Sequence, residues 1–353
     1  GLAVPDGVEP AEVASVDAGF AAVSSEEKID FALSLDAALS AADPRIVGHE
    51  GADYNDARVL SAVASTAGVR AAETETIAQA AVWALASDGT EVTTGFGLDA
   101  ARGFSALDPE VVVAEAVSRA TGLLGAAKAA SERVTVVLDP YVTSQFLGIV
   151  AEMLSGDEVA RGRSPFGERM GESVASELLG LADDPHAPDA PTSGAHDGVG
   201  LATRAVPLIE SGRLVGFLHN SYSARMLDAV PTASAARSGH RGAPGVGPRV
   251  LSPTPGTMSA GELHSRVSDA VVVQEFAGLH SGVNPVSGDL SVGIEGYRLR
   301  GGERAEPVKE VTVASSIQRM LADIVAVGSD LRRFPWESSG VSLAIADVTL
   351  SGT

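Results

Sequence analysis

The pattern that most restricts the fold is a pair of long, partly alternating stretches in the first third of the chain. Residues 59–66 and 77–85 partly alternate between apolar and polar or small side chains, and turns containing Gly and Asp flank them. Ser87-Asp88-Gly89 has the composition of a tight hairpin turn. The high alanine content argues against strands, because alanine favours helix. We nevertheless predict long antiparallel strands between Arg45 and Phe96.

Helix signals lie on both sides of these strands. Ser24 and Glu27 have the spacing of a capping box, which predicts a helix from there to Asp43-Pro44. Asp108 followed by Pro109 is a second strong start, with Asp at the N-cap and Pro at the first helical position. The N-terminal part of the chain therefore predicts two helices and an antiparallel sheet.

Strand patterns dominate the second part of the chain. A boundary is predicted near residues 127–132, which divides the chain into residues 1–130 and residues 131–353. The second unit is predicted to contain a strand at 133–139, a helix from Pro140 to about Leu154, a hairpin of 202–210 and 213–220 around Ser211-Gly212, strands at 271–276, 291–300, 308–313 and 341–350, a turn at Gly301-Gly302, and a helix at 316–325. The predicted fold class is α+β, with an N-terminal α+β domain followed by a β-rich, mainly antiparallel C-terminal domain.

Charge and composition exclude several classes of function. The net charge is −21, so the surface repels nucleic-acid phosphates and anionic lipid. The chain has no cysteine, which excludes disulfides, Cys-ligated zinc and a thiol nucleophile. No apolar run reaches the length of a membrane span, and residues 1–10 lack the pattern of a signal peptide. We expect a cytoplasmic protein that binds neither nucleic acid nor membrane.

A search for catalytic motifs finds only fragments. His49-Glu50 begins a zinc-protease motif, but no second His follows at the required spacing. The chain contains no P-loop and no Gly-x-Ser-x-Gly elbow. The loop from Asp183 to Asp197 is the segment richest in Asp and His. Its composition fits either a solvated loop or a site for a divalent ion.

The most informative segment runs from His280 to Asp289 and reads His-Ser-Gly-Val-Asn-Pro-Val-Ser-Gly-Asp. It combines turn-forming residues with several polar groups. A loop of this kind presents backbone N–H groups and side chains to a ligand, but it serves equally well as a tight turn between strands. From the residues alone, both interpretations stay open.

This loop resembles a signature of the TldD/PmbA family. Residues 278–296 are similar to the family's Gly-x-Asn-Pro-x-x-Gly-Asp segment as it stands in TldE/PmbA-type chains. The similarity continues in the same order at Gly162-Arg163-Ser164, residues 172–176, Asp183-Asp184-Pro185, residues 208–225, residues 307–312 and residues 324–330. It therefore covers nearly the whole chain. Members of the family begin with a further N-terminal segment, and we expect that segment to be missing from residues 1–130.

The resemblance implies a peptidase of two chains, in which a TldD-like chain carries the zinc site. That site consists of His-Glu-x-x-x-His on a helix and a Cys near the C-terminus. Here the corresponding helix positions are Gly148, Ile149 and Met153, and the C-terminal stretch is Ser338-Ser339-Gly340. None of these residues offers a zinc ligand or a general base for hydrolysis. We therefore expect no metal, no cofactor and no catalytic residue in this chain.

The hypothesis that follows is a TldE/PmbA-like subunit of a heterodimeric zinc metallopeptidase. The zinc lies in the TldD-like partner, and this chain helps to form the cleft for a peptide substrate in proteolysis or peptide maturation. The residues expected to position that substrate are His280, Asn284, Gly288 and Asp289. Two alternatives stay open. One is a stand-alone homodimeric enzyme with non-zinc chemistry at this loop, and the other is a non-catalytic regulatory or scaffold protein.

Overall fold

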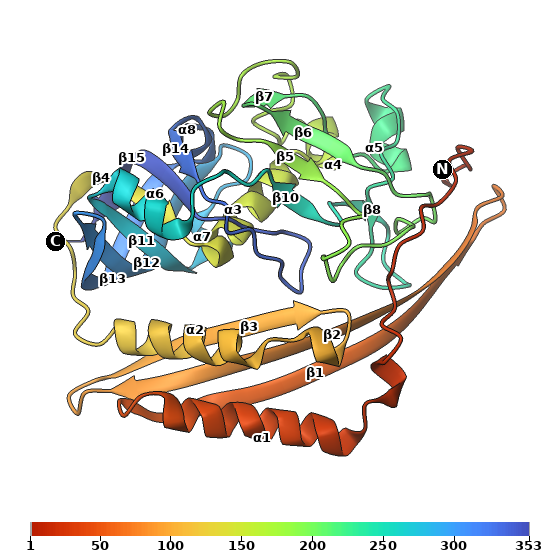
Figure 1. Cartoon of the computed structure of the whole chain (residues 1–353). Helices are drawn as coiled ribbons and strands as arrows, with labels where there is room; N and C mark the ends of the chain where they lie inside the picture. Colours follow the sequence, from red (N-terminus) through yellow and green to blue (C-terminus); the bar gives the residue numbers. More distant parts are fainter. Residues whose placement is uncertain (1, 353) are drawn as a thin grey trace.

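The computed structural model describes residues 2–352 and contains two layers (Figure 1). The first layer is an antiparallel sheet with the strand order β1-β2-β3, so β1 lies at its edge. Its elements are η1 (Phe20–Ala22), α1 (Ser25–Ala42), β1 (Ile46–Ala64), β2 (Arg70–Ser87), β3 (Val92–Ala101), η2 (Phe104–Ala106) and α2 (Pro109–Gly122). Beyond β3, β1 and β2 continue as a long hairpin that reaches toward the N-terminal segment (Figure 1). The predicted strands and their turn are confirmed, although β1 and β2 are longer than the alternating stretches.

Both predicted helix starts are confirmed by their capping contacts. The Ser24 hydroxyl accepts the Glu27 N–H at 3.2 Å, and the Glu27 carboxylate accepts the Ser24 N–H at 2.8 Å. The Asp108 carboxylate accepts the N–H groups of Glu110 (3.0 Å) and Val111 (3.2 Å). These contacts satisfy N–H groups that the first turn of a helix leaves unpaired. The local sequence alone therefore determines where α1 and α2 begin.

Packing against helices explains the alanine content of β2. Its even-numbered residues from 76 to 86 are buried, and four of them are alanines packed in a core with residues of α1 and α2. On β3, Gly95 and Gly97 lie directly against α2, where a Cβ on either would overlap the helix backbone. Small side chains thus allow the helix to approach the sheet closely, and alanine serves packing here rather than helix formation.

The second layer is built on a mixed sheet with the order β13-β12-β11-β4-β15-β14, in which β4 and β11 form the parallel pair. Its strands are β4 (Glu132–Leu138), β11 (Ala270–Ala277), β12 (Asp289–Arg300), β13 (Glu303–Ser316), β14 (Ile324–Val327) and β15 (Leu343–Ser351). Helix α3 (Pro140–Met153) buries Phe146 and Leu147 in the main core. The predicted fold class is confirmed: an N-terminal α+β part precedes a β-rich, mainly antiparallel C-terminal part.

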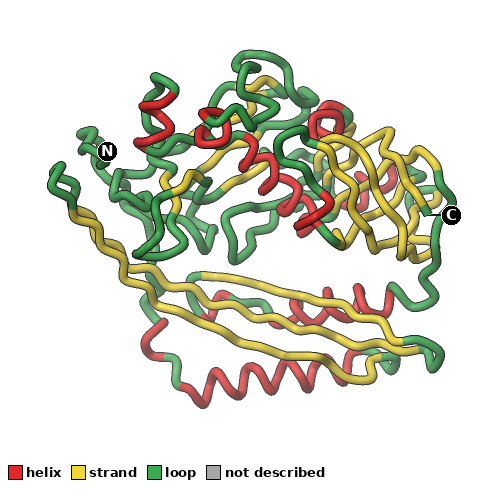
Figure 2. The backbone as a smooth tube through the Cα atoms, turned by 180° about the vertical axis from the view of Figure 1, so that it is seen from behind, coloured by secondary structure: helices red, strands yellow, loops and turns green. Residues whose placement is uncertain are grey.

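Short elements fill the rest of this layer, and loops connect most of them (Figure 2). A smaller sheet has the order β10-β5-β6-β7. The bounds are β5 (Leu181–Asp183), β6 (Val206–Glu210), β7 (Arg213–Leu214), β8 (Ala235–Ala236), β9 (Gly245–Val246), β10 (Leu251–Pro253), α4 (Gly156–Ala160), α5 (Ser221–Met226), α6 (Ala260–Val267), α7 (Leu279–Gly282) and α8 (Ile317–Ala322). Between residues 2 and 352, none of the helices has the length and apolar character to cross a membrane.

The hairpin predicted around Ser211-Gly212 forms, but its second strand is much shorter than expected. The strand predicted over 213–220 ends at Leu214. The N–H groups of Val215 and Gly216 both point to the carbonyl of Leu208, at 2.8 and 3.4 Å. This shared acceptor breaks the regular ladder, and the chain then leaves the sheet.

The helix predicted over 316–325 is also wrong in extent. It ends at Ala322, and the residues that follow form β14 (Ile324–Val327), which pairs with β15. Three of the four residues of β14 are β-branched, and such side chains favour a strand once a neighbouring strand is available.

A buried ion pair joins the two layers. Arg119 on α2 donates through Nη2 to Asp139 Oδ2 at 2.6 Å, and the two side chains are only 8% and 13% exposed. Arg119 Nη1 donates to the carbonyl of Gln274 on β11 at 2.5 Å, and the guanidinium lies 4.7 Å from the centroid of the Phe96 ring. Asp139 also accepts the Val142 N–H at 2.8 Å and so caps α3. Burial raises the pKa of Asp139, and the charge of Arg119 opposes that shift.

We predict that Arg119→Met lowers the free energy of unfolding by about 3–5 kcal/mol, because it leaves the Asp139 carboxylate buried without a cation. Urea unfolding followed by circular dichroism measures the loss. The matched control is Arg300→Met, which removes an exposed pair with Glu306 and should change stability little. Equal urea midpoints for the two variants would show that the buried pair does not hold the layers together.

Candidate functional site

A large cavity lies between the far half of the β1–β2 hairpin and loops of the second layer. Its volume is about 870 Å³, within the range of ligand-binding pockets. We call it the hairpin cleft. Its walls come from residues 59–64 and 71–77 of the hairpin, Arg102, parts of residues 191–203, residues 233–240 and 247–249, and Glu337.

A small apolar cluster closes the tip of the hairpin onto the second layer. Val63 and Val69 from the tip pack with Leu201, Ala233 and the N-terminal residue Ala3. The hairpin is therefore held at its tip by this cluster, while the Arg119–Asp139 pair joins the two layers near the opposite end of the sheet. The shape of the cleft follows from these two attachments.

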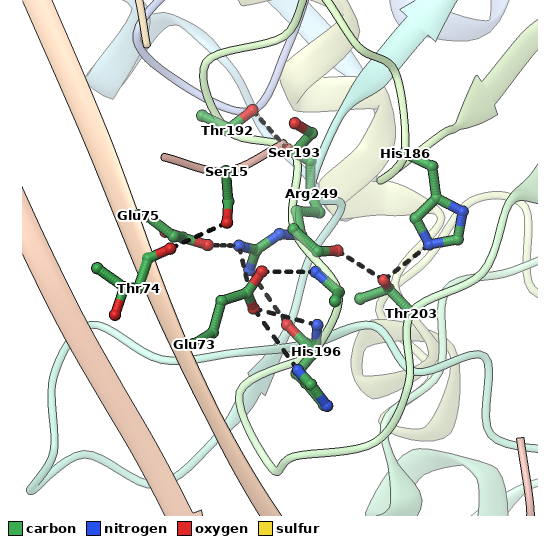
Figure 3. Close-up of polar contacts among 12 residues, drawn as sticks. Ser15, Glu73, Thr74, Glu75, His186, Thr192, Ser193, His196, Thr203 and Arg249 are labelled. Carbon is green, nitrogen blue, oxygen red and sulfur yellow. Dashed lines mark hydrogen bonds and ion pairs between the residues drawn. The ribbon is translucent and has the colours of Figure 1, made fainter. Parts of the chain in front are cut away.

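Two carboxylates and one guanidinium cross the cleft, as Figure 3 shows. Glu73 and Glu75 are two residues apart on β2 and so point from the same face of the sheet. The Glu73 carboxylate accepts the N–H groups of Ala195 (2.7 Å) and His196 (3.2 Å). Arg249 forms an ion pair with Glu75 and lies 3.9 Å from Glu73. Burial lowers the pKa of Arg249, and the charge of Glu73 opposes that shift.

The Asp- and His-rich loop that begins at Asp183 supports this wall through carboxylate side chains that accept backbone N–H groups. Asp183 Oδ1 accepts the N–H groups of Arg249 (2.9 Å) and Val250 (2.7 Å). Asp197 accepts three further backbone N–H groups, and His186 Nε2 lies 3.1 Å from the Thr203 hydroxyl. Across residues 2–352, no three His, Asp or Glu side chains are arranged to hold a metal ion. The carboxylates of Asp183 and Asp197 stabilise the backbone around them through the hydrogen bonds given above.

Two of the places to which the resemblance assigns the zinc site, Gly148 and the C-terminal stretch at Ser338, are neighbours. A Cβ on Gly148 of α3 would lie 3.3 Å from the hydroxyl of Ser338, so the helix and the C-terminal stretch are neighbours. The side chains present do not fit zinc, however. Met153 is 1% exposed within the core, Ile149 is aliphatic, and Ser338-Ser339-Gly340 offers no thiol.

An aromatic cluster, which the sequence analysis missed, lies beside these positions. The rings of Phe334 and Trp336 stack with centroids 4.9 Å apart, and Tyr141 on α3 meets both edge to face. The indole N–H of Trp336 donates to the Ser144 hydroxyl at 3.2 Å. Glu337, the residue that follows Trp336, lines the hairpin cleft. The arrangement can bind a ligand, but it contains no group placed for hydrolysis.

The four predicted positioning residues lie in one segment outside the walls of the hairpin cleft: His280 is in α7, Asn284 and Gly288 are in the loop that follows, and Asp289 begins β12. Asn284 Oδ1 accepts the N–H groups of Val286 (3.0 Å) and Ser287 (3.3 Å), so it stabilises the turn itself. Gly288 has φ +83°, and a Cβ there would meet the Gln318 side chain, so glycine is required. The loop leaves the side chains of His280 and Asp289 exposed.

The Asp289 carboxylate accepts the Ser287 hydroxyl at 2.7 Å and otherwise faces solvent. The structure thus divides the predicted set into two residues that shape the turn and two that remain available to a ligand. The cleft residues Glu73, Glu75 and Arg249 were missed, although two carboxylates alternating on a strand were visible in the sequence.

Two family sequence models match the chain. One, described as the PmbA/TldA metallopeptidase central domain, matches residues 19–124, and the other, described as the PmbA/TldA metallopeptidase C-terminal domain, matches residues 131–352. Among curated proteins, Metalloprotease PmbA of Escherichia coli is 26% identical over 312 residues, which cover 88% of this chain and 67% of that protein. A metalloprotease of Methanothermobacter thermautotrophicus is 32% identical over 267 residues, which cover 70% of this chain and 55% of that protein.

Solved structures show the same fold. A Thermotoga maritima protein, described as a candidate modulator of a DNA gyrase, superposes with a TM-score of 0.92 and 26% identity, covering 98% of this chain and 79% of that one. TldE of Thermococcus kodakarensis superposes with a TM-score of 0.87 and 20% identity, covering 100% of this chain and 79% of that one. At that identity, the second likeness concerns the fold alone.

Because Asp183 is buried where it accepts the Arg249 N–H, we predict that the stability of the chain depends on the protonation of Asp183. Burial raises the pKa of Asp183 to about 6, so between pH 4 and 6 the folded chain binds more protons than the unfolded chain. Stability from this group is therefore present at low pH and is lost as the pH rises through that window. Asp183→Asn keeps an acceptor for both N–H groups without the charge. We expect it to gain up to about 3 kcal/mol relative to the natural chain between pH 4 and 7.

Urea unfolding of both proteins across that pH range measures the difference. A difference in unfolding free energy that stays constant with pH would contradict the assignment of this proton to Asp183.

Proposed function

Because this chain belongs to the TldD/PmbA family of metallopeptidases, we propose that it is the metal-free, TldE/PmbA-like subunit of a two-chain peptidase. It pairs with a TldD-like chain that carries the zinc, and it helps to hold an extended peptide while the partner cuts. Its own contribution is binding and positioning.

The observation that carries this proposal is the chemistry of α3. Gly148 lies against Ser338, and we infer that these two positions correspond to the family's metal centre without its ligands. Zinc-dependent hydrolysis needs a metal to polarise the substrate or water and a general base to take a proton. Gly148, Ile149 and Met153 supply neither, so a second chain has to provide them.

The hairpin cleft supports the peptide part of the proposal. It runs along an edge strand, and clefts of this kind hold extended chains through main-chain hydrogen bonds. The loop with His280 and Asp289 offers further polar groups on a stiff support, since Asn284 and Gly288 fix its turn. These are the features expected of a subunit that orients a substrate without reacting with it.

We predict that the isolated chain binds no stoichiometric zinc and cleaves no peptide, whereas the complex with a TldD-like chain does both. The reason is that the metal ligands and the general base reside in the partner. Metal analysis after chelator-free purification and a peptidase assay on each chain and on the mixture test this. About one zinc per isolated chain, or cleavage by the isolated chain, would overturn the proposal.

Two substitutions separate positioning from turn formation in the loop. Asp289→Ala should lower kcat/KM of the complex while leaving its melting temperature and pairing unchanged, because the carboxylate is exposed and bonds only to Ser287. Asn284→Ala should instead cost about 0.5–2 kcal/mol of stability, because two N–H groups lose their acceptor. If the Asp289 variant melts earlier yet cleaves normally per folded complex, the loop is scaffolding.

A further inference from the structure

One wall of the hairpin cleft is unusually poor in acidic residues. Residues 229–261 contain no Asp or Glu, in a chain that has 46 of them among 353 residues. Three basic side chains of this segment, Arg237, His240 and Arg249, line the cleft. In a protein of net charge −21, this wall is a local basic surface that faces the cleft.

The carboxylates of the cleft lining act mainly on Arg249 or on backbone N–H groups. Glu73 and Glu75 face Arg249 across the cleft, and the charge of Glu337 also acts on Arg249. Asp197 accepts backbone N–H groups of its own loop and of Ala235. None of the four forms an ion pair with the other arginines of the lining.

Arg237 is held by neutral groups only. Its Nε donates to the carbonyl of Gly198 at 2.6 Å, its Nη1 donates to the carbonyl of Gly242, and its Nη2 has no partner among the described residues. Two carbonyls thus orient the guanidinium while its charge is left without a counter-ion. An exposed, oriented guanidinium of this kind matches the two oxygens of a carboxylate.

Arg102 repeats this arrangement on the opposite wall. It donates to the carbonyl of Thr76 at 3.3 Å and to the carbonyl and hydroxyl of Ser193, the hydroxyl at 2.9 Å. Its Nε is buried without a hydrogen-bond partner. The nearby charge of Glu73 acts on it through space, but that carboxylate is already bonded to the 195–196 backbone.

We propose that the hairpin cleft selects peptides that carry a carboxylate, and that Arg237, assisted by Arg102, receives it. This inference rests on the proposed function as a peptide-binding subunit and names the chemistry that the cleft prefers. The overall charge of the chain repels acidic peptides, so the oriented guanidinium is what makes such a ligand favourable at this place. The carboxylate comes either from an acidic side chain or from the C-terminus of the peptide.

Calorimetric titration of the purified full chain with three N-acetylated peptides of one extended neutral sequence tests this. The first peptide has a single Glu and an amidated C-terminus, the second has no acidic residue and a free C-terminus, and the third has neither carboxylate. At least one of the first two should bind about tenfold more tightly than the third, or about 1.4 kcal/mol. The peptide that gains identifies the source of the carboxylate, and the gain should shrink at high salt.

Arg237→Gln should remove this preference without weakening the neutral peptide, because the amide can still donate to the Gly198 carbonyl. Arg241→Gln is the matched control, since Arg241 is exposed on the same loop but does not line the cleft. Equal affinity for all three peptides, or an equal loss with Arg241→Gln, would overturn the inference while leaving peptide binding intact. If none of the peptides binds, the proposed function fails with it.

Discussion

The pair of Arg119 and Asp139 is the contact on which the arrangement of the molecule depends. Both charges are buried away from water, so each is stabilised mainly by the other. Separating the two groups would therefore cost free energy. The same contact caps α3 and engages a carbonyl of β11. This pair therefore joins the first layer to α3 and to β11.

Features encoded by neighbouring residues could be predicted from the sequence, whereas those that depend on distant pairing could not. The Ser24 and Asp108 caps lie within one helical turn of their partners, and the strand pattern of β2 repeats every two residues. By contrast, Arg249 and Glu75 are 174 positions apart and meet only after both layers have formed. The early end of the strand at Leu214 likewise depends on a shared acceptor across the hairpin.

The candidate site shows the same division. The loop from His280 to Asp289 is one contiguous segment, so its residues had to lie together, and its turn-forming role could be read from Asn284 and Gly288. The hairpin cleft is lined by segments from both layers, which are far apart along the chain. The sequence alone therefore does not show that the basic side chains of residues 229–261 face a cleft. Helix α3 is held by apolar packing of residues such as Phe146, which does not require a bound metal.

The position of β1 at the edge of its sheet has a consequence for the fate of surplus chain in a cell. Near its start, the strand carries charged side chains such as Glu50, Asp53 and Asp56, which discourage another strand from pairing with it. The far half, from Val59 to Ala64, has no charge, and Leu60 is 74% exposed there. Unless something covers this stretch, it is the part of the molecule most prone to edge-to-edge aggregation. Chains made in excess of whatever shields that edge would therefore be substrates for protein quality control.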